Sequence, residues 1–189
     1  MKRLMVVLFA AVAACSRPMS FVQYREPAGE FSVEVPAGWN VNERGSFSKR
    51  PVGEVWWAGK IVDQHEGWPV GALLFVRKLD RHPDKGQERY RRNTLLETDA
   101  LFSGGQPADL AVKSGDFAGH PARWFQRDFD DSVGGGIHGA VKTYPSRVSG
   151  IAIQTPETYY VLEYRATREL FDRYMPAFER LTASFKLGK

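Results

Sequence analysis

The 189-residue sequence contains one cysteine, Cys15. A chain with one cysteine has no internal disulfide, and an unpaired cysteine in an exported protein needs another explanation. The sequence also has no apolar run long enough to cross a bilayer: the run from Leu4 to Ala14 has 11 residues, whereas a transmembrane helix needs roughly 20. Since Lys2 and Arg3 precede this run, it predicts a secretory signal peptide rather than a membrane anchor.

The end of the apolar run, Val-Ala-Ala-Cys at residues 12–15, resembles the lipobox of bacterial lipoproteins, in which small residues precede a cysteine that becomes acylated. Lipidation of Cys15 would account for the unpaired thiol. The alternative is an ordinary signal peptide cleaved after an Ala-x-Ala-like site. The resemblance implies attachment to a membrane through lipid. Ser16, in place of the aspartate that favours inner-membrane retention, favours the periplasmic side of the outer membrane.

The predicted organisation is a signal peptide over residues 1–14, a lipidated cysteine and polar tether over 15–27, and a single domain over 28–189. Without Lys2 and Arg3, 24 of the 26 basic residues remain against 22 acidic ones. So small a net positive charge argues against a nucleic-acid partner.

Alternating side chains predict strands along much of the domain. Phe31, Val33 and Val35 alternate with polar residues, which is typical of a half-buried strand. Apolar and β-branched residues predict further strands over 55–62, 72–79, 111–117, 122–129, 139–144 and 158–164. Glycine-containing turns separate several of them, so we expect an antiparallel meander.

Two segments predict helices. Residues 84–102 contain no proline and are rich in Glu, Arg, Leu and Gln, a composition with favourable helix propensity. Apolar residues recur at three- and four-residue steps over 170–185, which places them on one helix face. Thr167 is the predicted N-cap of this second helix. Pro176 is expected to kink or restart it.

Three segments, Phe31–Trp39, Gly119–Trp124 and Tyr159–Phe185, together resemble the Mog1/PsbP-like superfamily. The resemblance implies an α+β fold: an antiparallel β-sheet with helices packed on its faces, an α/β/α sandwich. The superfamily includes photosystem II subunits, a Ran-binding protein and bacterial envelope lipoproteins. Because the matching motifs are structural, the resemblance implies no catalytic residue and no cofactor.

Residues for catalysis or metal binding are not signalled. The four histidines are His65, His82, His120 and His138. None of them has the spacing of a zinc motif, so no metal site is predicted. The carboxylates of Asp128, Asp130 and Asp131 are close in sequence but lack the EF-hand pattern. No Gly-x-Ser-x-Gly motif is present. A small-ligand or cell-wall-associated enzyme with residues from scattered loops is the alternative function, with His120, His138 and Asp128 as the residues to test.

Arg89, Arg91 and Arg92 form a basic cluster, which indicates either contact with an acidic partner or membrane, or a solvated helix face. Trp56 and Trp57 must point to opposite faces of a strand. An uncovered face would make Trp57 a partner contact, and core packing is the alternative. The predicted function is a lipid-anchored periplasmic binding or accessory module with an envelope partner, no metal and no cofactor.

Overall fold

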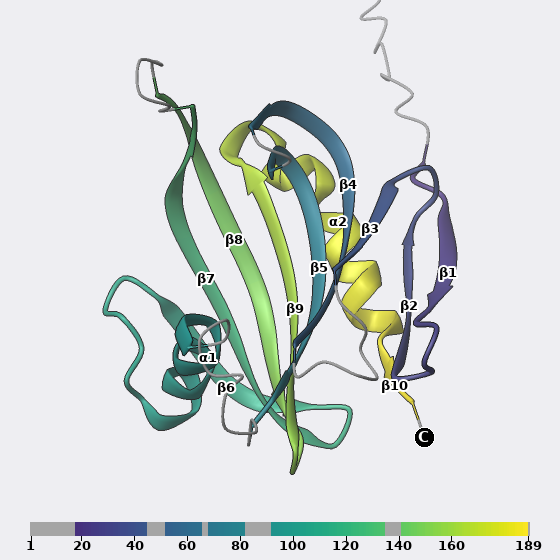
Figure 1. Cartoon of the computed structure of the whole chain (residues 1–189), viewed down its shortest axis with the longest axis vertical. Coiled ribbons are helices and arrows are strands. Elements are labelled where there is room, and N and C mark those ends of the chain that lie inside the picture. Colours follow the sequence, from purple (N-terminus) through teal and green to yellow (C-terminus); the bar gives the residue numbers. More distant parts are fainter. Residues whose placement is uncertain (1–17, 45–51, 66–67, 82–91, 135–140, 189) are drawn as a thin grey trace, which may run out of the picture.

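The computed structural model describes residues 18–44, 52–65, 68–81, 92–134 and 141–188. These residues form a seven-stranded antiparallel sheet, a three-stranded antiparallel sheet and two helices (Figure 1). The large sheet consists of β3 (Asn40–Arg44), β4 (Val52–His65), β5 (Trp68–Asp80), β9 (Thr158–Thr167), β8 (Lys142–Gln154), β7 (His120–Val133) and β6 (Ala111–Phe117), in that spatial order. The small sheet consists of β1 (Phe21–Arg25), β2 (Phe31–Pro36) and β10 (Lys186–Leu187).

The two helices, α1 (Arg92–Ser103) and α2 (Arg168–Ser184), cover opposite faces of the large sheet. Neighbouring residues of β9 show this directly, because strand side chains alternate between faces. Leu162 packs in the cluster that contains the apolar face of α2. Val161 packs in the cluster that contains Leu101 of α1. The predicted α+β fold, an antiparallel sheet with helices on its faces, is therefore confirmed.

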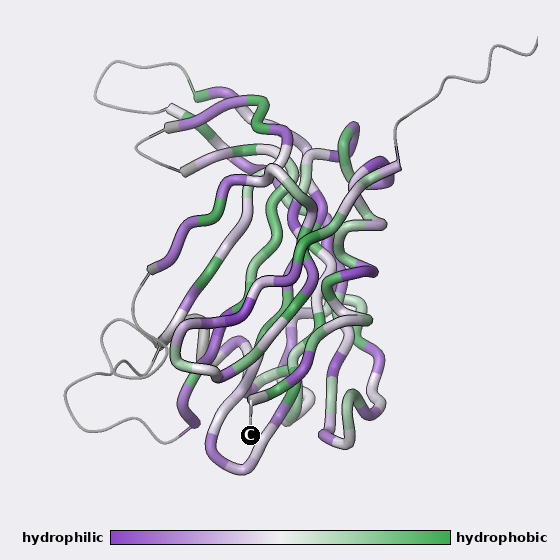
Figure 2. The backbone as a smooth tube through the Cα atoms, turned by 90° about the vertical axis from the view of Figure 1, so that its right-hand side faces the viewer, coloured by the Kyte–Doolittle hydropathy of each residue, from purple (hydrophilic) through white to green (hydrophobic). Residues whose placement is uncertain are grey.

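The main core lies between the large sheet, α2 and the small sheet. The central strands carry hydrophobic residues along much of their length (Figure 2). Phe171, Phe178 and Leu181 of α2 are buried against these strands, as their helical spacing predicts. The helix runs through Pro176 without a break, and Thr167 occupies its N-cap position without a side-chain cap hydrogen bond. Neither described helix is long and apolar enough to span a membrane.

Several strands are longer than the sequence predicts, and the largest differences concern β8 and β1. β8 continues to Gln154, ten residues beyond the predicted end, although Pro145 and Gly150 lie within it. Gly150 is tolerated because the ring of Phe125 lies over it: an added Cβ would come within 2.2 Å of that ring. β1 lies in the segment assigned to the tether and pairs with β2 along its whole length.

Candidate functional site

A pocket of about 380 Å³ opens on the sheet face that carries α1, and we call it the α1-face pocket. Its apolar lining consists of Leu101, Pro107, Leu110, Phe125, Val148 and Val161. Its charged lining consists of Glu54, Arg77, Glu97, Arg127, Glu163 and Arg165. The apolar groups come from both the sheet and the α1 region, so the pocket has apolar walls on two sides beside its charged groups.

Strand register places the charged side chains on this face. Arg165 of β9 is the Cα partner of Val148 in β8, and Val148 is in turn the partner of Arg127 in β7. Directly paired residues project to the same side of a sheet. Arg127, Val148 and Arg165 therefore form one row across three neighbouring strands.

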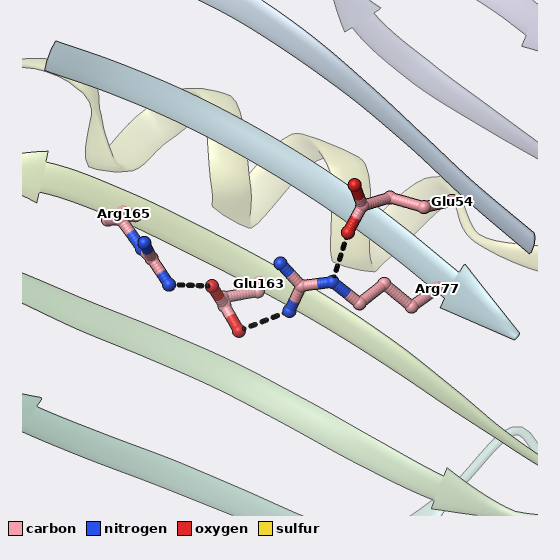
Figure 3. Close-up of polar contacts among 4 residues, drawn as sticks. All are labelled: Glu54, Arg77, Glu163 and Arg165. Carbon is pink, nitrogen blue, oxygen red and sulfur yellow. Dashed lines mark hydrogen bonds and ion pairs between the residues drawn. The ribbon is translucent and has the colours of Figure 1, made fainter. Parts of the chain in front are cut away.

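A chain of ion pairs links β4, β5 and β9 at the pocket wall (Figure 3). Arg77 donates from Nε to Glu54 over 2.5 Å and from Nη1 to Glu163 over 2.9 Å. Arg165 donates from Nη2 to the second carboxylate oxygen of Glu163 over 3.2 Å. Glu163 thus accepts hydrogen bonds from the guanidinium groups of both Arg77 and Arg165. These charge-assisted bonds order the side chains at this wall of the pocket.

The ionisation of Glu163 reflects a balance between burial and charge. Burial opposes ionisation, but the positive charges of Arg77 and Arg165 outweigh it and hold the pKa of Glu163 below its usual range. In the same way, Arg77 loses hydration on burial, yet Glu163 and Glu54 keep its pKa above the usual value. Glu163 and Arg77 therefore remain charged at neutral pH.

Acidification is expected to remove the stabilisation that this network gives. Because the pKa of Glu163 is lower in the folded chain than its usual value of 4.5, ionised Glu163 stabilises the fold above that value. The contribution is lost as pH falls through the lower folded pKa. Urea unfolding measures the free energy of unfolding of the wild type and of Glu163→Gln at several pH values. The difference between the two proteins should become smaller as the pH is lowered from about 7 to about 3. A constant difference across this range would contradict the assignment.

Arg165 and Arg127 retain unused hydrogen-bonding capacity. The Arg165 guanidinium lies 5.7 Å from the ring centre of Phe75 and 5.1 Å from that of Phe129. Its Nε is buried and has no hydrogen-bond partner among the described residues. Within the same described part of the chain, no ion pair or hydrogen bond involves the Arg127 side chain. Both arginines line the pocket, so both are available to a ligand.

Trp57 lies in the core rather than at a partner surface. Its side chain is 2% exposed and packs edge-on against Tyr24, with ring centres 5.1 Å apart. Trp56 points to the opposite face and stacks on Phe75, which confirms the predicted alternation. The predicted partner contact by Trp57 is therefore corrected to core packing, because the face that it occupies is covered.

The predicted lipidation site and the basic cluster lie largely outside the described part of the chain. Cys15, Arg89 and Arg91 lie outside the described residues. Arg92 begins α1, but its side chain is not among those described. Lipidation and the basic contact therefore remain predictions.

The residues suggested for the enzyme alternative do not form a described cluster. His120 and Asp128 are eight residues apart on the continuous strand β7, a separation of about 26 Å at about 3.3 Å per residue. His138 lies outside the described residues. Asp128 instead pairs with Arg147 and Arg168. Among the described residues, no group of three His, Cys, Asp or Glu side chains is arranged to hold a metal ion.

Sequence reasoning missed the α1-face pocket. A signal was present in β9, where Glu163 and Arg165 occur two residues apart among apolar and aromatic neighbours. Such spacing places both charges on one strand face. Their partners on β4 and β5 could not be identified without the strand order.

The chain matches no protein-family model and no curated protein. Solved structures are similar to it at low identity. The cyanobacterial PsbP of Synechocystis is 12% identical, with a TM-score of 0.46 over 89% of this chain and 93% of that one. The Ran-binding protein Mog1p of Saccharomyces cerevisiae is 9% identical, with a TM-score of 0.42 over 89% and 96%. LpqN of Mycobacterium tuberculosis, described as involved in cell envelope biogenesis, is 13% identical, with a TM-score of 0.38 over 92% and 87%. All three are distant similarities, with identities of 13% or less.

Proposed function

We propose that this chain is a binding module of the bacterial cell envelope, and that its α1-face pocket receives a small ligand or a short segment of a partner. The observation that carries the proposal is a pocket of about 380 Å³ that combines apolar walls with an ion-pair network. Ligand sites also combine apolar walls with polar groups that orient the ligand, although the lining of this pocket is richer in charge than is usual for them.

The ion-pair network at the pocket wall is in place before any ligand arrives. Glu163 fixes Arg77 and Arg165, and two aromatic rings flank the guanidinium of Arg165. Side chains that are already ordered lose little conformational entropy on binding. This arrangement supports a recognition role for the pocket.

The proposed location is the periplasmic side of the outer membrane, with attachment through acylated Cys15. Several acyl chains on one residue would hold the protein firmly, so the folded domain would not need a membrane-binding surface. The pocket would then be free to contact an envelope protein or a small ligand. The cluster of Arg89, Arg91 and Arg92 remains a second proposed contact.

Cys15→Ser is expected to abolish lipid attachment. The wild-type protein should be recovered in the membrane fraction and the variant in the soluble fraction, because the acyl chains supply the membrane affinity. Cell fractionation followed by mass spectrometry of the N-terminal peptide measures both properties. Recovery of an unmodified wild-type N-terminus would contradict the lipoprotein assignment, and so would equal membrane association of the two proteins.

Leu110→Trp is expected to block the pocket. Leu110 is partly exposed and lines the opening, so a larger side chain can occupy the cavity with little disturbance of the core. In a crosslinking pull-down from intact envelopes, recovery of the bound partner or ligand should fall by about tenfold, which corresponds to about 1.4 kcal/mol of binding free energy.

Val22→Trp is the matched control for this experiment. Val22 is 50% exposed and lies on β1 of the small sheet, outside the lining of the pocket. Its replacement introduces the same side chain without filling the cavity, so recovery should equal that of the wild type. Equal recovery with Leu110→Trp would contradict a role for the pocket in binding.

A further inference from the structure

Two arginines flank Val148 on the floor of the α1-face pocket. Arg127, Val148 and Arg165 are Cα partners across β7, β8 and β9. Because neighbouring strands lie about 4.8 Å apart, the Cα atoms of the two arginines are separated by about 10 Å. Arginine side chains are long enough to converge over the intervening valine.

The ion-pair network leaves one of these arginines without a carboxylate partner. Arg77 and Arg165 share Glu163, and Arg77 also binds Glu54. These two carboxylates balance the two guanidinium groups. The third arginine, Arg127, has no carboxylate partner among the described residues. A guanidinium at the edge of an apolar pocket is well suited to a carboxylate or phosphate.

Arg165 can contribute further hydrogen-bond donors. One of its five N–H groups is used in the hydrogen bond from Nη2 to Glu163. The stacking contacts with Phe75 and Phe129 hold the guanidinium in place. Asp131 also interacts electrostatically with Arg165, but it is not among the residues that line the pocket.

Apolar groups adjoin the two arginines. Phe125 and Val148 form the sheet side of the pocket, and Leu101, Pro107 and Leu110 form the side next to α1. A dry apolar cavity of about 150 Å³ is large enough for benzene, and the pocket volume is about 380 Å³. The cavity therefore has room for an apolar body larger than a single ring.

We propose that the ligand is an anionic amphiphile, with an apolar chain in the pocket and one carboxylate or phosphate bound by Arg127 and Arg165. This inference rests on the proposed function of the pocket. Three glutamates line the pocket beside its three arginines, so the lining favours a ligand with a single negative group over a polyanion. Envelope lipids and free fatty acids share this chemistry.

The test compares decanoate, decyl phosphate and neutral decanol, each below its micelle concentration. The full chain carrying Cys15→Ser is used, since it has no acyl group of its own to compete for the pocket. We expect decanoate or decyl phosphate to bind at least about tenfold more tightly than decanol, because only the anions gain charge-assisted hydrogen bonds. The tighter of the two anions identifies a fatty-acid or a phospholipid type of head group.

Three substitutions in the Cys15→Ser background identify the residues that contact the probe. Arg127→Gln should weaken binding of the anion by about tenfold and leave decanol unchanged. Arg25→Gln is the control, because Arg25 is an exposed arginine on β1 and lies outside the pocket lining. Leu110→Trp should remove binding of all three probes, which locates them in the pocket.

The outcomes separate this inference from the proposed function. Equal binding of decanol and the anions would overturn the anionic ligand, and so would an unchanged anion affinity in Arg127→Gln. Either result leaves the pocket as a binding site. If no probe binds while the envelope pull-down still depends on Leu110, the amphiphile is overturned and a partner segment occupies the pocket. If both experiments fail, the proposed function fails as well.

Discussion

Replacement of Arg77 by methionine is expected to lower the free energy of unfolding by about 3–5 kcal/mol. The side chains of Arg77, Glu54 and Glu163 are only 16%, 15% and 9% exposed. Without the Arg77 guanidinium, Glu54 loses its ion-pair partner and Glu163 keeps only Arg165. Water cannot fully solvate these carboxylates, so much of the cost of burying their charge remains. Urea unfolding at neutral pH measures the change.

Arg147→Met is the matched control. Arg147 pairs with Asp128 over 2.6 Å, but the two side chains are 34% and 41% exposed. Ion pairs accessible to solvent contribute about 0–1 kcal/mol, so the control should lose far less stability than Arg77→Met. Similar small losses in both variants would show that the Arg77 network is open to water and does not fix the wall of the pocket.

Trp57→Ala is expected to destabilise the chain by about 3–5 kcal/mol. Trp57 is among the largest fully buried side chains, and its removal leaves a cavity beneath Tyr24 in the main core. The loss combines the lost burial of an indole with the cost of the cavity. Thermal and urea unfolding should both detect it.

Val41→Ala is the control for Trp57→Ala, because Val41 is the cross-strand neighbour of Trp57. Val41 pairs with Trp57 but is 50% exposed, so Val41→Ala should change the unfolding free energy by only about 0.5 kcal/mol. If Trp57→Ala unfolded like the wild type and instead lost a partner, Trp57 would be a partner contact and the assignment to the core would be wrong.

Local patterns predicted the elements that decide the fold class. The alternation in β9 and the three- and four-residue spacing in α2 each depend on neighbours in sequence, and both elements are present. The length of β8 was not predictable in the same way. Pro145 and Gly150 disfavour a strand locally, but pairing with β7 and β9 on both sides stabilises it.

The pocket depends on contacts that the sequence does not display. Arg77 and Glu163 are 86 residues apart, and they meet because β5 lies beside β9 in the large sheet. The opposite orientations of Trp56 and Trp57 followed from strand geometry. The burial of Trp57 depends on how the small sheet and α2 pack over its face, and this is a property of the whole fold.

A photo-crosslinking amino acid placed at Leu110 tests the binding role of the pocket most directly. The acylated protein would be irradiated in intact envelopes, with the same probe at exposed Val22 as the control. We expect a discrete lipid or protein adduct from position 110 and none from position 22, with the adduct weakened by Arg127→Gln. An absence of any specific adduct at position 110, with crosslinks formed only at position 22, would contradict a ligand site on the α1 face.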